Sequence, residues 1–253
     1  MSESFDEADH ATAVDLATRA GQILLGVRAS GAVGSELKSL GDRTSHDFLV
    51  AELARRRPHD AVLSEEGADD PRRLEYDRVW VVDPVDGTRE FAEPPRDDWA
   101  VHVALCVGGA PVVGAVALPA RGEVYGTADP YPALRAPAAT PRILASRTRS
   151  GGLGELLRDE FGGELIPMGS AGAKAMAVVR GDADLYAHAG GQFEWDSAAP
   201  VAVARAAGLH VSRLSGAPLK YNRPSPWLPD LLICHPDLAR PVLDLIDRYG
   251  HRR

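Results

Sequence analysis

Residues 80–91, WVVDPVDGTREF, join an apolar run to two aspartates, a proline, a glycine and a threonine. The apolar residues 80–82 are β-branched or aromatic, which predicts a buried strand. Pro84 has a fixed φ and no N–H with which to continue the hydrogen bonds of a sheet. The sequence therefore predicts that the strand ends and the chain turns at Asp83.

Such a turn would collect oxygen atoms on one side of the chain. It would bring together the carboxylates of Asp83 and Asp86 and leave the carbonyl of Val85 unpaired. Gly87 can adopt a positive φ, and Thr88 is expected to begin a short helix whose free N–H groups would face an anion. The segment could hold a metal ion and a phosphate together. However, Asp, Pro and Gly are also the usual residues of an ordinary turn, so this segment alone leaves both interpretations open.

Two further acidic blocks favour a metal site. Glu65 lies in SEEG, directly after an apolar run, and Asp196 lies in EWDSAAP. If these two carboxylates join Asp83 and Asp86, their mutual repulsion must be offset by cations.

In this order, the three blocks resemble the motifs of the inositol monophosphatase superfamily of magnesium-dependent, lithium-sensitive phosphatases. That pattern is a Glu-Glu pair after a strand, then Asp-Pro-(Ile/Leu/Val)-Asp-Gly-Thr, then Trp-Asp much later. The stretches LSEEG, DGTREF, RDDWAVHVAL, GSAGAKAMAV and HAGGQFEWDSAAP are most similar to CysQ-type 3'(2'),5'-bisphosphate nucleotidases of actinobacteria. The resemblance implies an α/β (α+β) fold, a five-layer αβαβα sandwich, with the site in a cleft between two halves.

The resemblance also implies a metal centre of two or three Mg²⁺ ions, for which Mn²⁺ could substitute. Glu65, Asp83 and the Val85 carbonyl would hold one ion, while Asp83, Asp86 and Asp196 would hold a second. The first ion would activate a water molecule and the second would offset charge on the leaving oxygen, without a phosphoenzyme.

Three residues are candidates for catalysis on the same resemblance. Thr88 and an upstream aspartate would orient and deprotonate the attacking water, and Glu65 would act beside them. We expect Asp42 rather than Asp47 in this role, because Asp42 occupies the predicted N-cap of a helix whereas Asp47 falls inside that helix and is expected to be solvated.

A glycine-rich segment, Gly169 to Lys174, precedes a predicted helix and could bind an anion. For the glycines alone, a tight strand-to-helix connection without a ligand is the favoured interpretation, and Lys174 shifts the balance toward an anion site. The resemblance implies that Ser170 and Lys174 contact the second phosphate or the ribose, with Arg89 or Arg96 as further candidates. The residues expected to bind substrate are Asp86, Gly87, Thr88, Ser170, Lys174 and Asp196.

The first helix is expected to begin at a capping box formed by Ser4 and Glu7 and to run for about 25 residues. The second is expected to begin at Asp42 and to stop near Pro58. Three apolar stretches follow, at 99–107, 112–118 and 123–127, and short glycine- and proline-containing links join them. This pattern predicts an antiparallel meander of three strands. Beyond them, strands and helices alternate, at 142–146, 153–161, 164–168, 172–180, 183–188, 196–207, 209–214, 230–234 and 237–249.

Residues 130–140 are rich in proline and alanine and are interpreted as a joint. They would separate an N-terminal α+β half, residues 1–129, from a C-terminal α/β half, residues 141–253. The predicted site would lie between these halves.

The composition narrows the classes of partner. A net charge of −8 argues against nucleic-acid polymers, although a small phosphate ester remains compatible. Cys106 and Cys234 lie in apolar runs and are expected to be free thiols. No apolar stretch is long enough to span a membrane and the N-terminus has no signal-like segment, so we expect a cytoplasmic protein, with a homodimer as one option for its assembly.

The resemblance to CysQ-type nucleotidases implies hydrolysis of 3'-phosphoadenosine 5'-phosphate to AMP and phosphate, with its 5'-phosphosulfate form as a second substrate, in sulfur assimilation. Inositol monophosphate and fructose 1,6-bisphosphate are alternative substrates because they would require the same metals. A non-catalytic sensor of a phosphorylated ligand is the alternative from another class.

Overall fold

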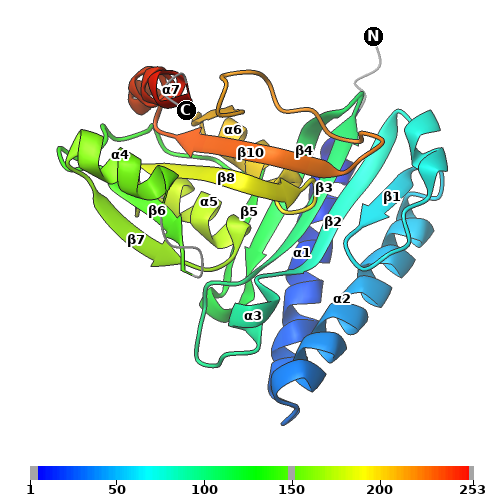
Figure 1. Cartoon of the computed structure of the whole chain (residues 1–253). Helices are drawn as coiled ribbons and strands as arrows, with labels where there is room; N and C mark the ends of the chain where they lie inside the picture. The colour runs from blue at the N-terminus through cyan, green and yellow to red at the C-terminus, as the bar shows by residue number, and fades with distance from the viewer. Residues whose placement is uncertain (1–4, 148–151, 251–253) are drawn as a thin grey trace.

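Two five-stranded sheets form the framework of the protein, and the computed structural model describes residues 5–147 and 152–250 (Figure 1). The strands are β1 Ala61–Ser64, β2 Arg78–Asp86, β3 Ala100–Val107, β4 Ala110–Leu118, β5 Glu123–Gly126, β6 Arg142–Ser146, β7 Glu164–Met168, β8 Leu185–Phe193, β9 His210–Ser212 and β10 Trp227–Cys234. The α-helices are α1 Glu7–Arg28, α2 Gly34–Arg56, α3 Thr88–Phe91, α4 Leu153–Phe161, α5 Ala171–Val179, α6 Ala198–Ala206 and α7 Pro236–Gly250; the 3₁₀ helices are η1 Pro71–Glu75 and η2 Pro119–Arg121.

The first sheet has the order β1-β2-β3-β4-β5, with β1 and β2 parallel and the other pairs antiparallel. Side chains alternate across it, as the twofold repeat of a strand requires. Trp80 and Val82 pack in the cluster that includes α1 and α2, whereas Val79 and Val81 pack in the cluster that includes α5 and α6. The first sheet is therefore covered on both faces.

The second sheet has the order β7-β6-β8-β10-β9 and lies on the other side of α5 and α6 (Figure 1). Its strand residues Tyr186 and Ile233 face these middle helices. Leu185 and Leu232 face outward and pack with Leu157 of α4 and with α7. The layers are α1 and α2, the first sheet, α5 and α6, the second sheet, then α4 and α7, which confirms the predicted five-layer sandwich.

The meander and the alternating second half match the sequence predictions closely. Strand β6, helix α4 and strand β7 have the predicted bounds, and the other elements of this half differ mainly at their ends. Residues 130–141 contain no helix or strand. The division into halves at this segment remains a prediction.

The predicted starts of the first two helices were wrong. Ser4 lies outside the described residues, and α1 is capped by Asp6, whose carboxylate accepts the N–H of Asp9 at 2.9 Å. Helix α2 begins at Gly34, so Asp42 lies inside the helix and not at its N-cap. Gly41 is a packing residue, because a Cβ there would lie 2.5 Å from the Phe91 ring.

Both cysteines are buried and unpaired, as expected. Across residues 5–147 and 152–250, we find no helix that combines the length and the apolar character needed to traverse a bilayer.

Candidate active site

The end of β2 positions two aspartates through a bulge. Asp83 pairs with His102 and Asp86 pairs with Ala100, so the β2 side of the ladder contains one extra residue. In a regular strand, residues three apart point to opposite faces, but a bulge reverses this relation. The predicted turn at Asp83 was therefore wrong, and Pro84 is accommodated because the bulge interrupts the ladder.

The bulge brings Asp83 and Asp86 into one cluster with Asp196, which lies just before α6. One carboxylate oxygen from each lies within 4.8 Å of those of the other two, as the sequence predicted. Asp83 is 1% exposed and also accepts the N–H of Val85 at 3.0 Å. Glu65, the residue directly after β1, forms a side-chain hydrogen bond with Asp83. The four predicted acidic residues thus lie together.

The electrostatics of this cluster show uncompensated negative charge. Burial and the charge of Asp86 raise the pKa of Asp196 to about 6. Glu65 reaches the surface, but its carboxyl group is largely shielded from solvent. This desolvation and the charge of Asp196 raise the pKa of Glu65 to about 7. Burial and the neighbouring acids also raise the pKa of Asp83. A divalent cation would remove this repulsion, so the residues fit a metal site with oxygen ligands.

Asp86 differs from its neighbours because the protein already stabilises its charge. Its Oδ2 accepts hydrogen bonds from the Ser170 hydroxyl at 2.5 Å and from the Gly172 N–H at 2.6 Å, and its Oδ1 accepts the Ala171 N–H at 3.1 Å. Burial alone would raise the pKa of Asp86, but the positive charge of His102 and these hydrogen bonds lower it to about 2. The N–H groups at the start of α5, where the sequence allowed an anion-binding site, therefore bind the carboxylate of Asp86.

His102 is a site residue that the sequence analysis missed. Its ring is fully buried, with Nδ1 3.0 Å from the Trp195 carbonyl oxygen and Nε2 3.2 Å from Asp86 Oδ2. Burial opposes protonation, but the charge of Asp86 outweighs it and raises the pKa of His102. A Cβ on Gly172 would lie 2.1 Å from Nε2, so the glycine admits the ring. A histidine within the otherwise apolar strand β3 was the available sequence signal.

Thr88 begins α3 and contacts its expected partner Asp42 as well as the Val85 carbonyl, which was predicted to be unpaired. Its hydroxyl donates to the Val85 carbonyl at 3.1 Å, so that carbonyl is not unpaired, although a second lone pair remains. The Thr88 side chain also hydrogen-bonds with Asp42. Burial and the charge of Glu66 raise the pKa of Asp42 to about 6 despite this bond. The expected pair is present, although its aspartate comes from the middle of α2. Asp47 is exposed, as expected.

The predicted substrate residues at the start of α5 have partners within the protein. Lys174 is buried, and its Nζ donates to the carbonyl oxygens of Gly169 at 2.6 Å and Ser170 at 2.8 Å. Ser170 has an unusual φ of +29° and caps α5 by accepting the Ala173 N–H. In this conformation Lys174 stabilises the loop rather than facing a ligand. Gly87, with φ +84°, allows close approach, because a Cβ there would lie 3.1 Å from Ser170 Cβ.

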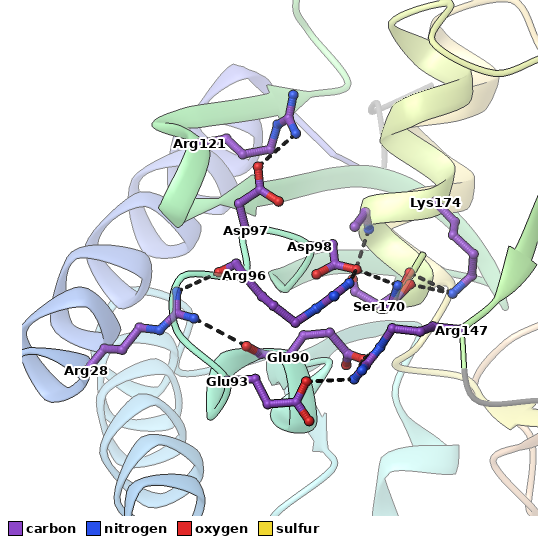
Figure 2. Close-up of polar contacts among 12 residues, drawn as sticks. Arg28, Glu90, Glu93, Arg96, Asp97, Asp98, Arg121, Arg147, Ser170 and Lys174 are labelled. Carbon is purple, nitrogen blue, oxygen red and sulfur yellow. Dashed lines mark hydrogen bonds and ion pairs between the residues drawn. The ribbon is translucent and has the colours of Figure 1, made fainter. Parts of the chain in front are cut away.

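A network of ion pairs surrounds this loop (Figure 2). Asp98 accepts the Gly169 N–H at 2.6 Å and pairs with Arg96, so Arg96 already has an anionic partner. Arg147 contacts Glu90 at 2.6 Å and Glu93 at 3.0 Å. The strand-to-helix loop is therefore held from both sides, by Asp98 on its N–H group and by Lys174 on its carbonyls. Arg89 is exposed on α3.

A second hydrogen-bond network connects η1, which follows the SEEG block, with Glu194, which lies two residues before Asp196. Both contact residues 222–223. Arg73, only 2% exposed, donates to Asp69, to the Asn222 side-chain oxygen at 2.7 Å and to the Arg223 carbonyl at 2.9 Å. Glu194 accepts the N–H groups of Asn222 and Arg223 at 2.7 and 3.0 Å. These bonds tie two segments of the site to each other.

The clustered acidic residues agree with the family that a sequence comparison identifies for this chain. The profile of the inositol monophosphatase family matches residues 6–135 and 141–243. The chain belongs to the inositol monophosphatase family.

Relatives within the inositol monophosphatase family carry nucleotidase names. A Mycobacterium bovis protein named 3'-phosphoadenosine 5'-phosphate phosphatase is 50% identical over 236 residues, which cover 88% of this chain and 87% of the relative. A protein of the same name from Mycobacterium leprae is 47% identical, with 94% and 93% coverage. The Escherichia coli 3'(2'),5'-bisphosphate nucleotidase CysQ is 34% identical, with 72% and 78% coverage.

Solved structures of the inositol monophosphatase family have the same fold. CysQ from Bacteroides thetaiotaomicron superposes with a TM-score of 0.78 at 27% identity, covering 91% of this chain and 98% of that one. Inositol monophosphatase II from Staphylococcus aureus has a TM-score of 0.83 at 21% identity, with 96% and 97% coverage. The second likeness concerns the fold alone.

Proposed function

We propose that this chain is a magnesium-dependent phosphatase that hydrolyses 3'-phosphoadenosine 5'-phosphate to AMP and phosphate. The observation that carries the proposal is the cluster of Asp83, Asp86 and Asp196, with Glu65 beside it, in a chain 50% identical to a phosphatase of that name. Oxygen ligands and excess negative charge favour Mg²⁺, with Mn²⁺ as a substitute.

The metal ligands of the proposal are Glu65, Asp83, the Val85 carbonyl, Asp86 and Asp196. When bound, the cations would acidify a water molecule and offset charge on the leaving oxygen. Asp86 is already ionised and fixed by α5 and His102, so it presents a constant negative charge to the cluster.

Thr88 and Asp42 are the proposed acid–base residues. A pKa of about 6 lets Asp42 be ionised near neutral pH and still accept a proton. The Thr88 hydroxyl has one proton, so it donates to Val85 or to Asp42 and can accept a hydrogen bond from water through its lone pairs. In the proposed reaction, water attacks phosphorus and its proton passes to Asp42. The bond from phosphorus to the ribose 3'-oxygen breaks, and this oxygen leaves with the bonding electrons and takes a proton from solvent water.

Finer features of the proposal come from the family resemblance. They are turnover of the 5'-phosphosulfate form, inhibition by lithium, a role in sulfur assimilation, a cytoplasmic location and a homodimeric assembly. Ser170 and Lys174 remain proposed substrate residues only if the loop they now stabilise rearranges when the nucleotide binds.

Phosphate release from three substrates tests the proposal directly. Purified protein with Mg²⁺ should act on 3'-phosphoadenosine 5'-phosphate with a higher kcat/KM than on inositol monophosphate or fructose 1,6-bisphosphate, and Asp83→Asn should abolish release. A preference for either sugar phosphate would replace the proposed substrate. Tight nucleotide binding without turnover would support a sensor instead.

The acid–base assignment has its own test. Thr88→Val keeps the shape of the side chain but removes its hydroxyl, and we expect kcat to fall about a hundredfold, within the range for general acid–base groups. Thr18→Val is the matched control, because the Thr18 hydroxyl bonds only to the Val14 carbonyl of α1 among the contacts of the described chain, at 2.7 Å. Equal kcat values for the two variants would remove Thr88 from the mechanism.

A further inference from the structure

Two aromatic side chains lie exposed where β8 ends and β10 begins. Phe193 and Trp227 are paired across these antiparallel strands, which run side by side (Figure 1). Phe193 is 40% exposed and Trp227 is 45% exposed, an unusual position for two large apolar side chains in contact. Adjacent exposed aromatic side chains are typical of a binding surface.

A buried ring supports this aromatic pair. The Phe193 ring lies nearly parallel to that of Trp195, with the centroids 4.7 Å apart and the planes at 11°. Trp195 belongs to the core cluster around α5 and α6. Trp195 covers one face of the Phe193 ring, and the remaining exposed surface lets the stack accept another flat ring.

Trp227 adds a wall at a steep angle to the stack. Its ring lies 5.3 Å from that of Phe193, with the planes at 81°. Gly191 makes this position possible, because a Cβ there would lie 1.7 Å from the Trp227 ring. The Phe193 ring packs on Trp195 and the Trp227 ring packs over Gly191, and these contacts restrict both rings before any ligand arrives, which lowers the entropy lost on binding.

The aromatic pair is joined directly to the acidic cluster. The Phe193 N–H donates to Asp196 Oδ2 at 2.6 Å, so one hydrogen bond separates the stacking residue from a proposed metal ligand. In a nucleotide, the base and the 3'-phosphate are separated by one ribose. A ligand with its phosphate at the cluster could thus place its base near Phe193.

We propose that Phe193 and Trp227 form the base-stacking surface of the nucleotide site. The inference rests on the proposed function and deepens it, since it assigns the residues that distinguish a nucleotide from a sugar phosphate. Aromatic side chains bind any base through its π face, so this surface provides affinity for the base without reading its hydrogen-bonding edge.

Replacing the ring without emptying its position tests the assignment. We would compare wild type, Phe193→Leu, Phe193→Tyr and Trp227→Leu, with Leu25→Ala as a control at a 39% exposed position on α1. For each protein, KM and kcat for 3'-phosphoadenosine 5'-phosphate would be measured at saturating Mg²⁺, together with inhibition constants for AMP and for inorganic phosphate. Phosphate has no base and reports on the metal cluster alone.

In Phe193→Leu, the KM and the AMP inhibition constant should rise about tenfold, which corresponds to the loss of one stacked base. Trp227→Leu should shift both in the same direction. The phosphate inhibition constant and kcat should stay within twofold, Phe193→Tyr should behave as wild type, and Leu25→Ala should change nothing.

Equal shifts of the AMP and phosphate inhibition constants would overturn the assignment, because they would show damage to the metal cluster. Unchanged AMP inhibition would overturn it as well, and a changed oligomeric state in the same variant would then identify the pair as a contact between copies. If wild-type protein releases no phosphate from the nucleotide, the proposed function fails first; AMP binding measured by calorimetry on the same variants would still decide whether these rings bind a base.

Discussion

Removing divalent cations should make the stability of this protein fall as the pH rises from 5 to 8. In the unfolded chain, carboxyl groups lose their protons near pH 4. In the folded, metal-free protein, the raised pKa lets Asp196 keep its proton until about pH 6, and Asp83 is shifted in the same direction. The folded state therefore binds more protons than the unfolded state in this window, and the stability present below pH 4 is lost as the pH passes through these raised pKa values.

The size of the effect follows from the shift of Asp196. Between pH 5 and its folded pKa of about 6 lies one pH unit, which corresponds to about 1.4 kcal/mol of unfolding free energy. For a domain of this size, that amount lowers the Tm by about 3 to 6 °C. Saturating Mg²⁺ should reverse the loss at pH 8, since a cation at a hundred times its Kd adds about 2.7 kcal/mol.

Thermal unfolding followed by circular dichroism, in EDTA and then in excess Mg²⁺, measures both effects. Asp83→Asn removes one charge but keeps an oxygen that can accept the Val85 N–H, so the bulge should persist. This variant should be more stable than wild type at pH 8 in EDTA and should gain little from Mg²⁺. Asp47→Asn, at an exposed position of α2, is the control and should retain both responses.

Two results would refute this reasoning. One is a Tm of the metal-free wild-type protein that rises or stays level between pH 5 and pH 8. The other is an Asp83→Asn variant that gains as much from Mg²⁺ as wild type does. Either result would mean that the acidic residues do not share one cation site.

Two further predictions concern the networks that hold the site. Lys174→Met leaves two buried carbonyl oxygens without their charged donor, and chemical denaturation should show a loss of about 1 to 3 kcal/mol, whereas the exposed Lys220→Met should change stability by less than about 0.5 kcal/mol. An equal effect of the two lysine variants would contradict this. Arg73→Lys keeps the charge but loses the fork that joins the Asp69–Arg73 segment to residues 222–223, so we expect a loss of about 2 kcal/mol of unfolding free energy and a higher Mg²⁺ requirement. Arg72→Lys, in an exposed pair with Asp70, should match wild type. An unchanged Mg²⁺ requirement in Arg73→Lys would limit Arg73 to a purely structural role.

Local patterns determined most of the fold. The meander and the alternating strands and helices after residue 141 follow from apolar periodicity and from glycine and proline at their ends, and these signals lie within each segment. The helix starts were less predictable. The predicted helix start at Asp42 left Gly41 outside the helix, but packing against Phe91 favours glycine at position 41 inside α2.

The acidic cluster was predictable because its spaced motifs resemble those of a known family, and the repulsion between carboxylates then indicated that a shared site would require a cation. What the sequence left open was how each charge is balanced. The negative charge of Asp86 is stabilised by His102 and the N–H groups of α5, which lower its pKa, whereas the pKa values of Asp83 and Asp196 are raised. Only the packing of β3 and α5 against the β2 bulge decides this difference, because the partners lie up to 86 positions away in the chain. The same packing turns Lys174 inward, since the energy of a buried charge depends on its surroundings in space and not on its neighbours in sequence.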